Sequence, residues 1–541
     1  MQNKSMKRKN GFYLLIALPS LIVTLLIFVF PLVSVIRESL TTDESLVKTV
    51  KSAYTWRLFS FTFIQALLSA VISTALAVPF AFFFSSYTFP GRRLVLSIAD
   101  TAFVLPSVIV VLGFVIWYGN NGILNTLLAE ITDGKLKLSI LYSYRAIILA
   151  HVYLNFPLAF SVLTSSMITV GDREETAARF LGKGRMKVFF SVTLPKIKGS
   201  IYQTLLVIFL FCFPSFLIVM TLGGSPKYYT VEAEIYRRAY SEGNLASASS
   251  LAICSFAVMA ILLLLTGWGR KEKKTAKTRK TLKKAKGGKA LLAFVLSLIV
   301  ILFMLPPLLS IVYRSFYTRD GVFTLKTWKT LFTVQSETVL TAIISSALIA
   351  LLSSWVAVRM ATALSLSASR RNDRFLPLLS SLPLAAGSVT LGLGFSYLSS
   401  LLGTRSTVLS FLMTLLAHTT VTLPFAIRTI LPGAQRLSPS LLYSSLTLSS
   451  SHLKSYRKVE VPMLKSYRKK AFAFAFALSL GETNATLSLG SGRITTLPTL
   501  IYRMIEQYNY QGASALSLVL LVVSLTVFSL SERGGRKNGL S

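Results

Sequence analysis

Apolar stretches of about membrane-spanning length follow one another along the whole chain. A hydrocarbon core of roughly 30 Å takes about 20 helical residues to cross. Stretches of this kind lie near 12–36, 60–86, 94–118, 139–170, 201–222, 246–268, 291–312, 338–366, 375–402, 408–431, 471–489 and 513–530. The pattern predicts an all-α membrane protein with about twelve transmembrane helices.

The second half of the chain repeats the first. Three residue pairs are separated by the same 267 positions: His151 with His418, Pro157 with Pro424, and Pro195 with Pro462. A repeat of half the chain is far longer than a solenoid unit, so it indicates two homologous domains that pack together. We therefore predict a first six-helix domain over 1–268, a linker over 269–289 and a second six-helix domain over 290–541.

Composition agrees with a membrane location and indicates an orientation. Hydrophobic residues make up 53% of the chain and charged residues 14%, against roughly 25% charged residues in soluble domains. The linker carries eleven Lys or Arg residues and one acid, Glu272, and basic loops stay on the cytoplasmic side. The basic ends of the chain lie an even number of crossings away, so both termini are expected in the cytoplasm.

The net charge of +37 would also be compatible with nucleic-acid binding. The basic clusters, however, lie at the ends of apolar stretches and on one predicted face, as the positive-inside rule requires. We therefore expect no nucleic-acid partner, and we expect the linker to contact anionic membrane lipid.

The chain lacks the motifs of an enzyme. It has no G-x-x-x-x-G-K-[ST] loop to hold a nucleotide phosphate, so ATP hydrolysis would belong to a separate subunit. Three histidines offer little for a metal centre, and we expect neither a metal nor a cofactor. His151 and His418 are expected to hydrogen-bond between helices, and lining of a transport path is the alternative.

Glu482 is an acid within an apolar stretch, where a charge is costly and often functional. One interpretation places its carboxylate on a transport path. The interpretation that we favour is a hydrogen bond to Thr483 or to a neighbouring backbone group.

Residues 171–195, after the fourth apolar stretch, have the features of a short docking helix. Glu175 lies near its start, where the helix dipole favours an acid. Ala177 and Ala178 leave room for close approach, and Gly182 ends or turns the helix. Pro195 then returns the chain toward the membrane. The same plan recurs around Tyr443–Ser449 and finishes at Val461 and Pro462. We call the two stretches the first and second docking segments.

The first docking segment resembles a known signature. The E-A-A…G…L-P motif of permeases of type I ABC importers is similar to Glu175, Ala177, Ala178, Gly182 and Pro195. The acid of the motif usually stands one place later, where this chain has Thr176. The second docking segment has, at the corresponding positions, Tyr443, Ser444, Ser445, Ser449 and Pro462.

This resemblance covers nearly the whole chain and implies a fold and a set of partners. It implies the type I ABC importer permease fold in a plasma (inner) membrane. Two copies of a cytoplasmic ABC ATPase would contact the docking segments. An extracytoplasmic solute-binding protein would deliver the solute, and the two six-helix halves would rock to give alternating access.

Two stretches bear on the transported solute. Residues 211–228 are similar to permeases of thiamine importers, and residues 479–502 resemble thiamine and ferric-iron permeases alike. Thiamine is therefore the favoured solute and ferric iron the alternative. A gradient-driven secondary transporter would instead need intramembrane acids or broken helices at matching positions of both halves, and Glu482 has no acidic counterpart. A structural scaffold would need no duplicated docking segment.

Overall fold

The computed structural model of the chain describes residues 2–40, 45–102, 105–265, 280–371, 373, 375–403, 406–449, 451–490 and 492–536. Within these ranges the regular structure is helical, apart from two strands of two residues each and one isolated bridge. Packing divides the chain into two compact units. Unit 1 comprises residues 1–55, 231–270 and 324–541, and unit 2 comprises 56–230 and 271–323.

Ten of the described helices are long and apolar enough to cross a membrane. They are Gly11–Ser39, Ala53–Phe84, Ser107–Ile131, Tyr144–Thr169, Arg185–Cys212, Leu245–Leu265, Gly288–Phe316, Ser336–Arg371, Thr407–Arg436 and Tyr510–Val527. Phe375–Ala385 and Ser388–Leu401 meet at 85° and form an eleventh crossing if they count as one bent span. The prediction of an all-α membrane protein is confirmed.

Three of the twelve predicted stretches differ from continuous spans, namely the bent stretch 375–402 and two others. The stretch 94–118 is divided into α4 (Arg92–Ala102) and α5 (Ser107–Tyr118), with Pro106 directly before α5. Proline lacks an N–H donor and disfavours helix at the residue before it. The stretch 471–489 contains α22 (Lys465–Leu480), which has 16 residues, and the five-residue α23 (Asn484–Ser488). Helix α22 is about 24 Å long, shorter than a hydrocarbon core of roughly 30 Å.

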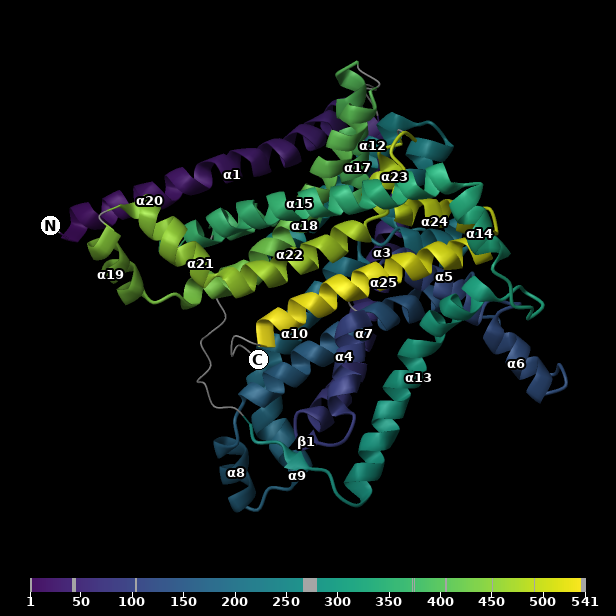
Figure 1. Cartoon of the computed structure of the whole chain (residues 1–541), viewed down its shortest axis with the longest axis horizontal. Helices are drawn as coiled ribbons and strands as arrows, with labels where there is room; N and C mark the ends of the chain where they lie inside the picture. The colour runs from purple at the N-terminus through teal and green to yellow at the C-terminus, as the bar shows by residue number, and fades with distance from the viewer. Residues whose placement is uncertain are drawn as a thin grey trace. The chain divides into compact units, whose positions relative to one another are not determined.

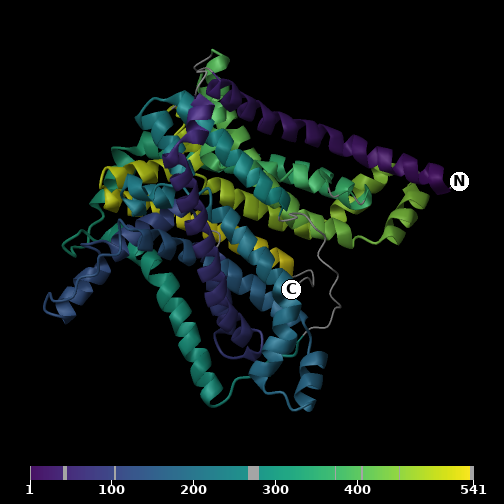
Figure 2. The same ribbon diagram turned by 180° about the vertical axis from the view of Figure 1, so that it is seen from behind.

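Unit 1 is built around three long helices that run side by side in Figures 1 and 2, namely α15 (Ser336–Arg371), α18 (Thr407–Arg436) and α22. Helix α1 (Gln2–Ser39) packs on α15, and α12 (Leu245–Leu265) packs on α1. The other helices of the unit are α2 (Ser45–Lys51), α11 (Val231–Tyr236), α14 (Lys326–Thr333), α16 (Phe375–Leu379), α17 (Ser388–Leu401), α19 (Pro439–Ser449), α20 (His452–Ser455), α21 (Val461–Met463), α23, α24 (Leu497–Glu506) and α25 (Tyr510–Arg536).

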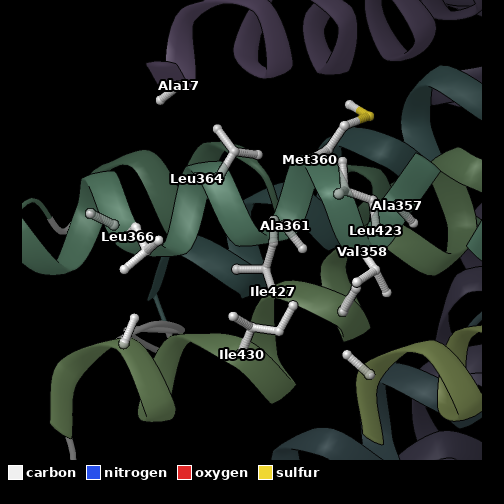
Figure 3. Packing of buried hydrophobic residues seen from close by; sticks show 14 of the residues in the cluster. Ala17, Ala357, Val358, Met360, Ala361, Leu364, Leu366, Leu423, Ile427 and Ile430 are labelled. Carbon is white, nitrogen blue, oxygen red and sulfur yellow. The ribbon is translucent and has the colours of Figure 1, made fainter. Parts of the chain in front are cut away.

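The apolar core of unit 1 forms where α1, α15 and α18 meet (Figure 3). Helix α15 contributes Ala357, Ala361 and Leu364, and these pack with Ile427 of α18 and Ala17 of α1. Lipid tails are as apolar as these side chains, so membrane helices associate through close packing, which small residues permit. The alanines of α15 therefore allow two neighbouring helices to approach its backbone.

Unit 2 contains the second to fifth apolar stretches of the first half and the first stretch of the second half. Its helices are α3 (Ala53–Phe84), α4, α5, α6 (Ile123–Ile131), α7 (Tyr144–Thr169), α8 (Arg173–Phe180), α9 (Arg185–Val188), α10 (Leu194–Cys212) and α13 (Gly288–Phe316). Helix α7 packs on α10 and α4, and α13 packs on α5 and α4. The strands β1 (Tyr87–Thr88) and β2 (Lys283–Lys284) pair in parallel.

The first long helix of each sequence half packs against the third stretch of the other half. In unit 1, α1 packs on α17, and a Cβ atom at Gly394 would lie 2.5 Å from the Pro31 carbonyl oxygen. In unit 2, α13 packs on α5, and a Cβ atom at Gly113 would lie 2.6 Å from the Pro307 carbonyl oxygen. Both contacts leave no room for a side chain. The compact units therefore do not coincide with the sequence halves 1–268 and 290–541, whose boundaries remain a prediction from the repeat.

The repeat is visible in the local structure around the docking segments. Helices α9 and α20 begin 267 residues apart, at 185 and 452, and have the same length. Each is followed by a π-helical turn, Phe189–Thr193 or Tyr456–Glu460. The next helix in each half has a proline in its first turn, Pro195 or Pro462. The missing N–H of that proline accounts for the wider turn before it.

Candidate functional site

The first docking segment is the short helix α8 and the turn that returns to α10. Its acid Glu175 is buried, with 4% of its surface exposed, so it does not face solvent. The Lys280 Nζ donates to both Glu175 carboxylate oxygens at 2.7 Å, and the Thr193 hydroxyl donates to Oε1 at 2.9 Å. Arg179, one turn later, lies 3.6 Å from Oε2. Glu175 therefore fastens α8 to its own unit.

Lys280 belongs to the end of the basic linker, and this end lies along unit 2. The Lys280 N–H donates to the Ile168 carbonyl at 2.9 Å, and the Thr281 N–H donates to Asp172 Oδ2 at 2.7 Å. Strand β2 follows directly and pairs with β1. The linker end thus contacts both the end of α7 and the start of α8. Residues 269–279 of the predicted linker lie outside the described residues.

The opposite face of α8 is exposed and partly apolar. Thr176 and Ala177 are exposed there, whereas Ala178 is 7% exposed and faces the unit. Phe180 and Leu181 follow at the end of the helix with 87% and 80% of their surface exposed. Large apolar side chains so accessible at the tip of a helix are typical of an interaction surface.

Gly182 ends α8 with a φ of +77°, in the left-handed region that glycine reaches without strain. Its N–H donates to the Arg179 carbonyl at 2.9 Å. A Cβ atom at this position would meet no atom within 4 Å. The sequence therefore requires glycine here for its backbone conformation, and the space above it is open.

The second docking segment comprises α19, α20 and the turn to α21. Tyr443 and Ser444 are exposed, and Ser445 is buried and hydrogen-bonded to Ser455. Ser444 and Ser445 thus repeat the exposed and buried positions of Ala177 and Ala178. The side chain of Ser449 lies outside the described part of the structure.

A buried carboxylate also fastens the second docking segment. Glu460, directly before Val461 and Pro462, is 2% exposed. Arg370, at the end of α15, donates through Nε to Glu460 Oε2 at 3.0 Å and through Nη1 to the Leu437 carbonyl at 3.4 Å. The Tyr13 hydroxyl of α1 donates to Oε1. Arg370 therefore contacts residues at both ends of the segment.

The two duplicated histidines lie in helix interfaces. His151 contacts Ser69 through Nδ1 at 3.1 Å and Ser215 through Nε2 at 2.9 Å. His418 contacts Ser479 through Nδ1 at 2.8 Å and Thr486 through Nε2 at 2.9 Å. Both rings are 2% exposed. These contacts support the helix-packing interpretation, and lining of a path by either ring stays a prediction.

Two carboxylates lie at the start of α17. Glu482 accepts from the Ala485 N–H at 3.0 Å, as the backbone interpretation requires, and Ser388 Oγ lies 3.4 Å from its other oxygen. Glu232 of α11, outside the candidate membrane spans, accepts from the Thr390 N–H at 3.3 Å and hydroxyl at 3.1 Å. Burial raises the pKa of Glu232 to about 8, although hydrogen bonds from Thr390 and Val389 oppose the shift.

The sequence analysis did not identify Phe180, Leu181 or Lys280 as functional residues. Phe180 and Leu181 carried a usable signal, because two large apolar residues end an otherwise polar helix. Lys280 gave none, since it is one of eleven basic residues in the linker. Among the described residues, no group of three or more His, Cys, Asp or Glu side chains could hold a metal ion.

Known proteins resemble this chain over most of its length. Residues 77–271 match the family described as "Binding-protein-dependent transport system inner membrane component". The thiamine transport system permease protein ThiP of Brucella abortus (strain 2308) is 28% identical over 495 residues, which cover 89% of this chain and 88% of the relative. ThiP of Escherichia coli (strain K12) is 27% identical over 500 residues, 89% and 90% of the two chains.

A shorter relative matches part of the chain. The molybdenum transport system permease protein ModB of Escherichia coli (strain K12) is 30% identical over 217 residues, which cover 38% of this chain and 92% of the relative.

Proposed function

This chain belongs to the binding-protein-dependent transport system inner membrane components, the permease subunits of type I ABC importers, and we propose that it translocates thiamine. The observation that carries the proposal is the similarity to thiamine transport permeases over 89% of the chain. That similarity extends over both halves. Because the chain belongs to this family, we set aside the alternatives of a gradient-driven secondary transporter and a structural scaffold.

Energy for transport would come from a separate ATPase. We propose that two copies of a cytoplasmic ABC ATPase bind the two docking segments. The exposed Thr176, Ala177 and Phe180 support this proposal, because they form an accessible face on a helix that is firmly attached to its unit. An extracytoplasmic binding protein would deliver thiamine, and selectivity would lie largely in that protein.

The proposed orientation places both termini and the linker in the cytoplasm. The linker end at Lys280 contacts α8, so the linker and the first docking segment belong to the same side of the membrane. The positive-inside rule assigns that side to the cytoplasm. The basic linker would contact anionic lipid there.

Uptake of labelled thiamine by intact cells tests the solute. Deletion of the gene for this chain should abolish ATP-dependent uptake of thiamine at low external concentration and leave ferric-iron uptake unchanged. A plasmid copy of the chain should restore thiamine uptake. Loss of ferric-iron uptake with normal thiamine uptake would instead establish the ferric-iron alternative.

A further inference from the structure

A buried carboxylate holds each docking segment in place. The two carboxylates, however, stand at different positions of the repeat. Counting 267 residues onward, Thr193 of the first segment corresponds to Glu460 of the second, and Glu175 corresponds to Leu442. At these two positions the first segment has Glu175 and Thr193, and the second has Leu442 and Glu460. Thr193 and Glu175 are in hydrogen-bond contact at 2.9 Å, so an acid at either position reaches the same place in the first segment.

The cations that meet these carboxylates come from unrelated parts of the chain. Lys280 belongs to the linker end and is 9% exposed, and Arg370 lies in the last turn of α15. Each of these residues also donates to backbone beside its segment: the Lys280 backbone N–H to the Ile168 carbonyl, and the Arg370 guanidinium to the Leu437 carbonyl. Each half of the chain thus has one buried ion pair at its docking segment. The two pairs are formed by residues that do not correspond in the repeat.

We propose that Lys280 and Arg370 are positioning residues of the transport cycle, each holding its docking segment rigidly to the membrane helices of its own unit. The proposal rests on the proposed function. A docked ATPase moves the helices only if the segment between them does not bend. A buried ion pair resists such bending, because separating it leaves an uncompensated charge in an apolar place.

This assignment separates two roles within the first docking segment. Glu175 and Ala178 face inward and hold the helix, so the carboxylate is not the group that meets the ATPase. Phe180 and Leu181 face outward and are free to bury apolar surface in a partner. The position of the acid, one place before that of the family motif, matches an inward direction.

The decisive experiment moves the acid from one position to the other. K280M and E175L each break the pair, and E175L/T193E rebuilds it in the arrangement of the second segment. Hydrogen exchange of the backbone amides in 176–181 is measured on the purified permease alone. Transport per ATP hydrolysed is measured in proteoliposomes with the ATPase and the loaded binding protein. K280R is the conservative control.

K280M and E175L should speed exchange in 176–181 at least about tenfold and lower transport per ATP by a similar factor. E175L/T193E and K280R should return both quantities to within about threefold of the wild type. Wild-type exchange and coupling in K280M and E175L would overturn the proposal. So would a double variant that is folded by thermal unfolding but no better coupled than E175L.

Failure of the proposed function has a different signature. In that case the wild type itself would show no ATP-driven thiamine transport, whereas the exchange measurement on the permease alone would still report whether Lys280 holds α8. R370M supplies an independent second test on the other segment. This variant should speed amide hydrogen exchange around Tyr456–Glu460 and leave exchange in 176–181 as in the wild type. An equal increase of exchange in both segments would contradict the assignment.

Discussion

At the scale of single residues, three buried glutamates connect separate elements of the fold. Glu175 and Glu460 each meet a cation and a hydroxyl group, whereas the partners of Glu232 among the described residues are uncharged donors of Thr390 and Val389. A carboxylate without a cation is costly to ionise when buried. Burial among uncharged donors therefore raises the pKa of Glu232 to about 8.

Replacement of Glu232 by glutamine should alter the pH dependence of stability. The pKa of Glu232 is about 8 in the folded protein, against an ordinary value of 4.5. The unfolded chain loses this proton more readily, so the wild type loses stability as pH rises from about 4.5 to about 8. E232Q removes that loss and should gain on the order of 4 kcal/mol at pH 8 but less than about 1 kcal/mol at pH 5.

Thermal unfolding in detergent at pH 5 and pH 8 measures this difference. E130Q, a change at an exposed acid of α6, is the control and should follow the wild-type curve. An E232Q protein whose stability relative to the wild type is the same at both pH values would show that Glu232 is ionised throughout.

At the scale of elements, the two docking segments share one plan but differ in their exposed faces. Both have an exposed small residue, Ala177 or Ser444, next to a buried one, Ala178 or Ser445. The first segment adds the exposed Phe180, whereas the matching position of the second is Thr447. Buried apolar area is a main source of association free energy. We therefore expect the first segment to contribute more to ATPase binding.

A matched pair of tryptophan substitutions tests this inequality. Ala177 and Ser444 are equivalent and exposed, so a tryptophan at either position disturbs the partner surface and not the permease interior. A177W should weaken ATPase binding by on the order of 1–3 kcal/mol, the usual cost of overpacking, and S444W by less. Co-purification of the ATPase with each variant gives the comparison. An equal or larger loss in S444W would show that the second segment contributes at least as much.

The sequence predicted helices well and helix ends poorly. Apolar length located most spans, and the 267-residue offset of Pro195 and Pro462 anticipated two similar turns. Pro106 broke a predicted span because its backbone lacks a donor. The inward direction of Glu175 could not be predicted, since its partner Lys280 is 105 residues away and resembles every other lysine of the linker.

At the scale of the whole molecule, the sequence halves are not the packing units. Helix α1 of the first half packs in unit 1, which holds most of the second half, and α13 of the second half packs in unit 2. The contacts at Gly394 with Pro31 and at Gly113 with Pro307 require close approach of these helices. Each half alone therefore lacks a helix that its apolar surface needs.

Expression of the two halves as separate chains, 1–275 and 276–541, should show this dependence. Each half alone should aggregate or be degraded, because α17 lacks α1 or α5 lacks α13. The two chains expressed together should co-purify and restore uptake. Size-exclusion chromatography in detergent measures both outcomes. A single half that is monodisperse and resists proteolysis would mean that the exchanged helices are dispensable for folding.

Because α1 packs in unit 1 and α13 in unit 2, the two units are completed at different times during synthesis. Unit 2 ends at residue 323, so all of its segments have left the ribosome when little more than half of the chain is made. Unit 1 begins with α1 and ends at residue 541. Helix α12 is made in the first half, but α15, α17 and α18, which also pack on α1, belong to the second half and are made later. During that interval the face of α1 that packs on α15 and α17 is uncovered and exposed to quality-control proteases, and slow translation of the second half would prolong the exposure.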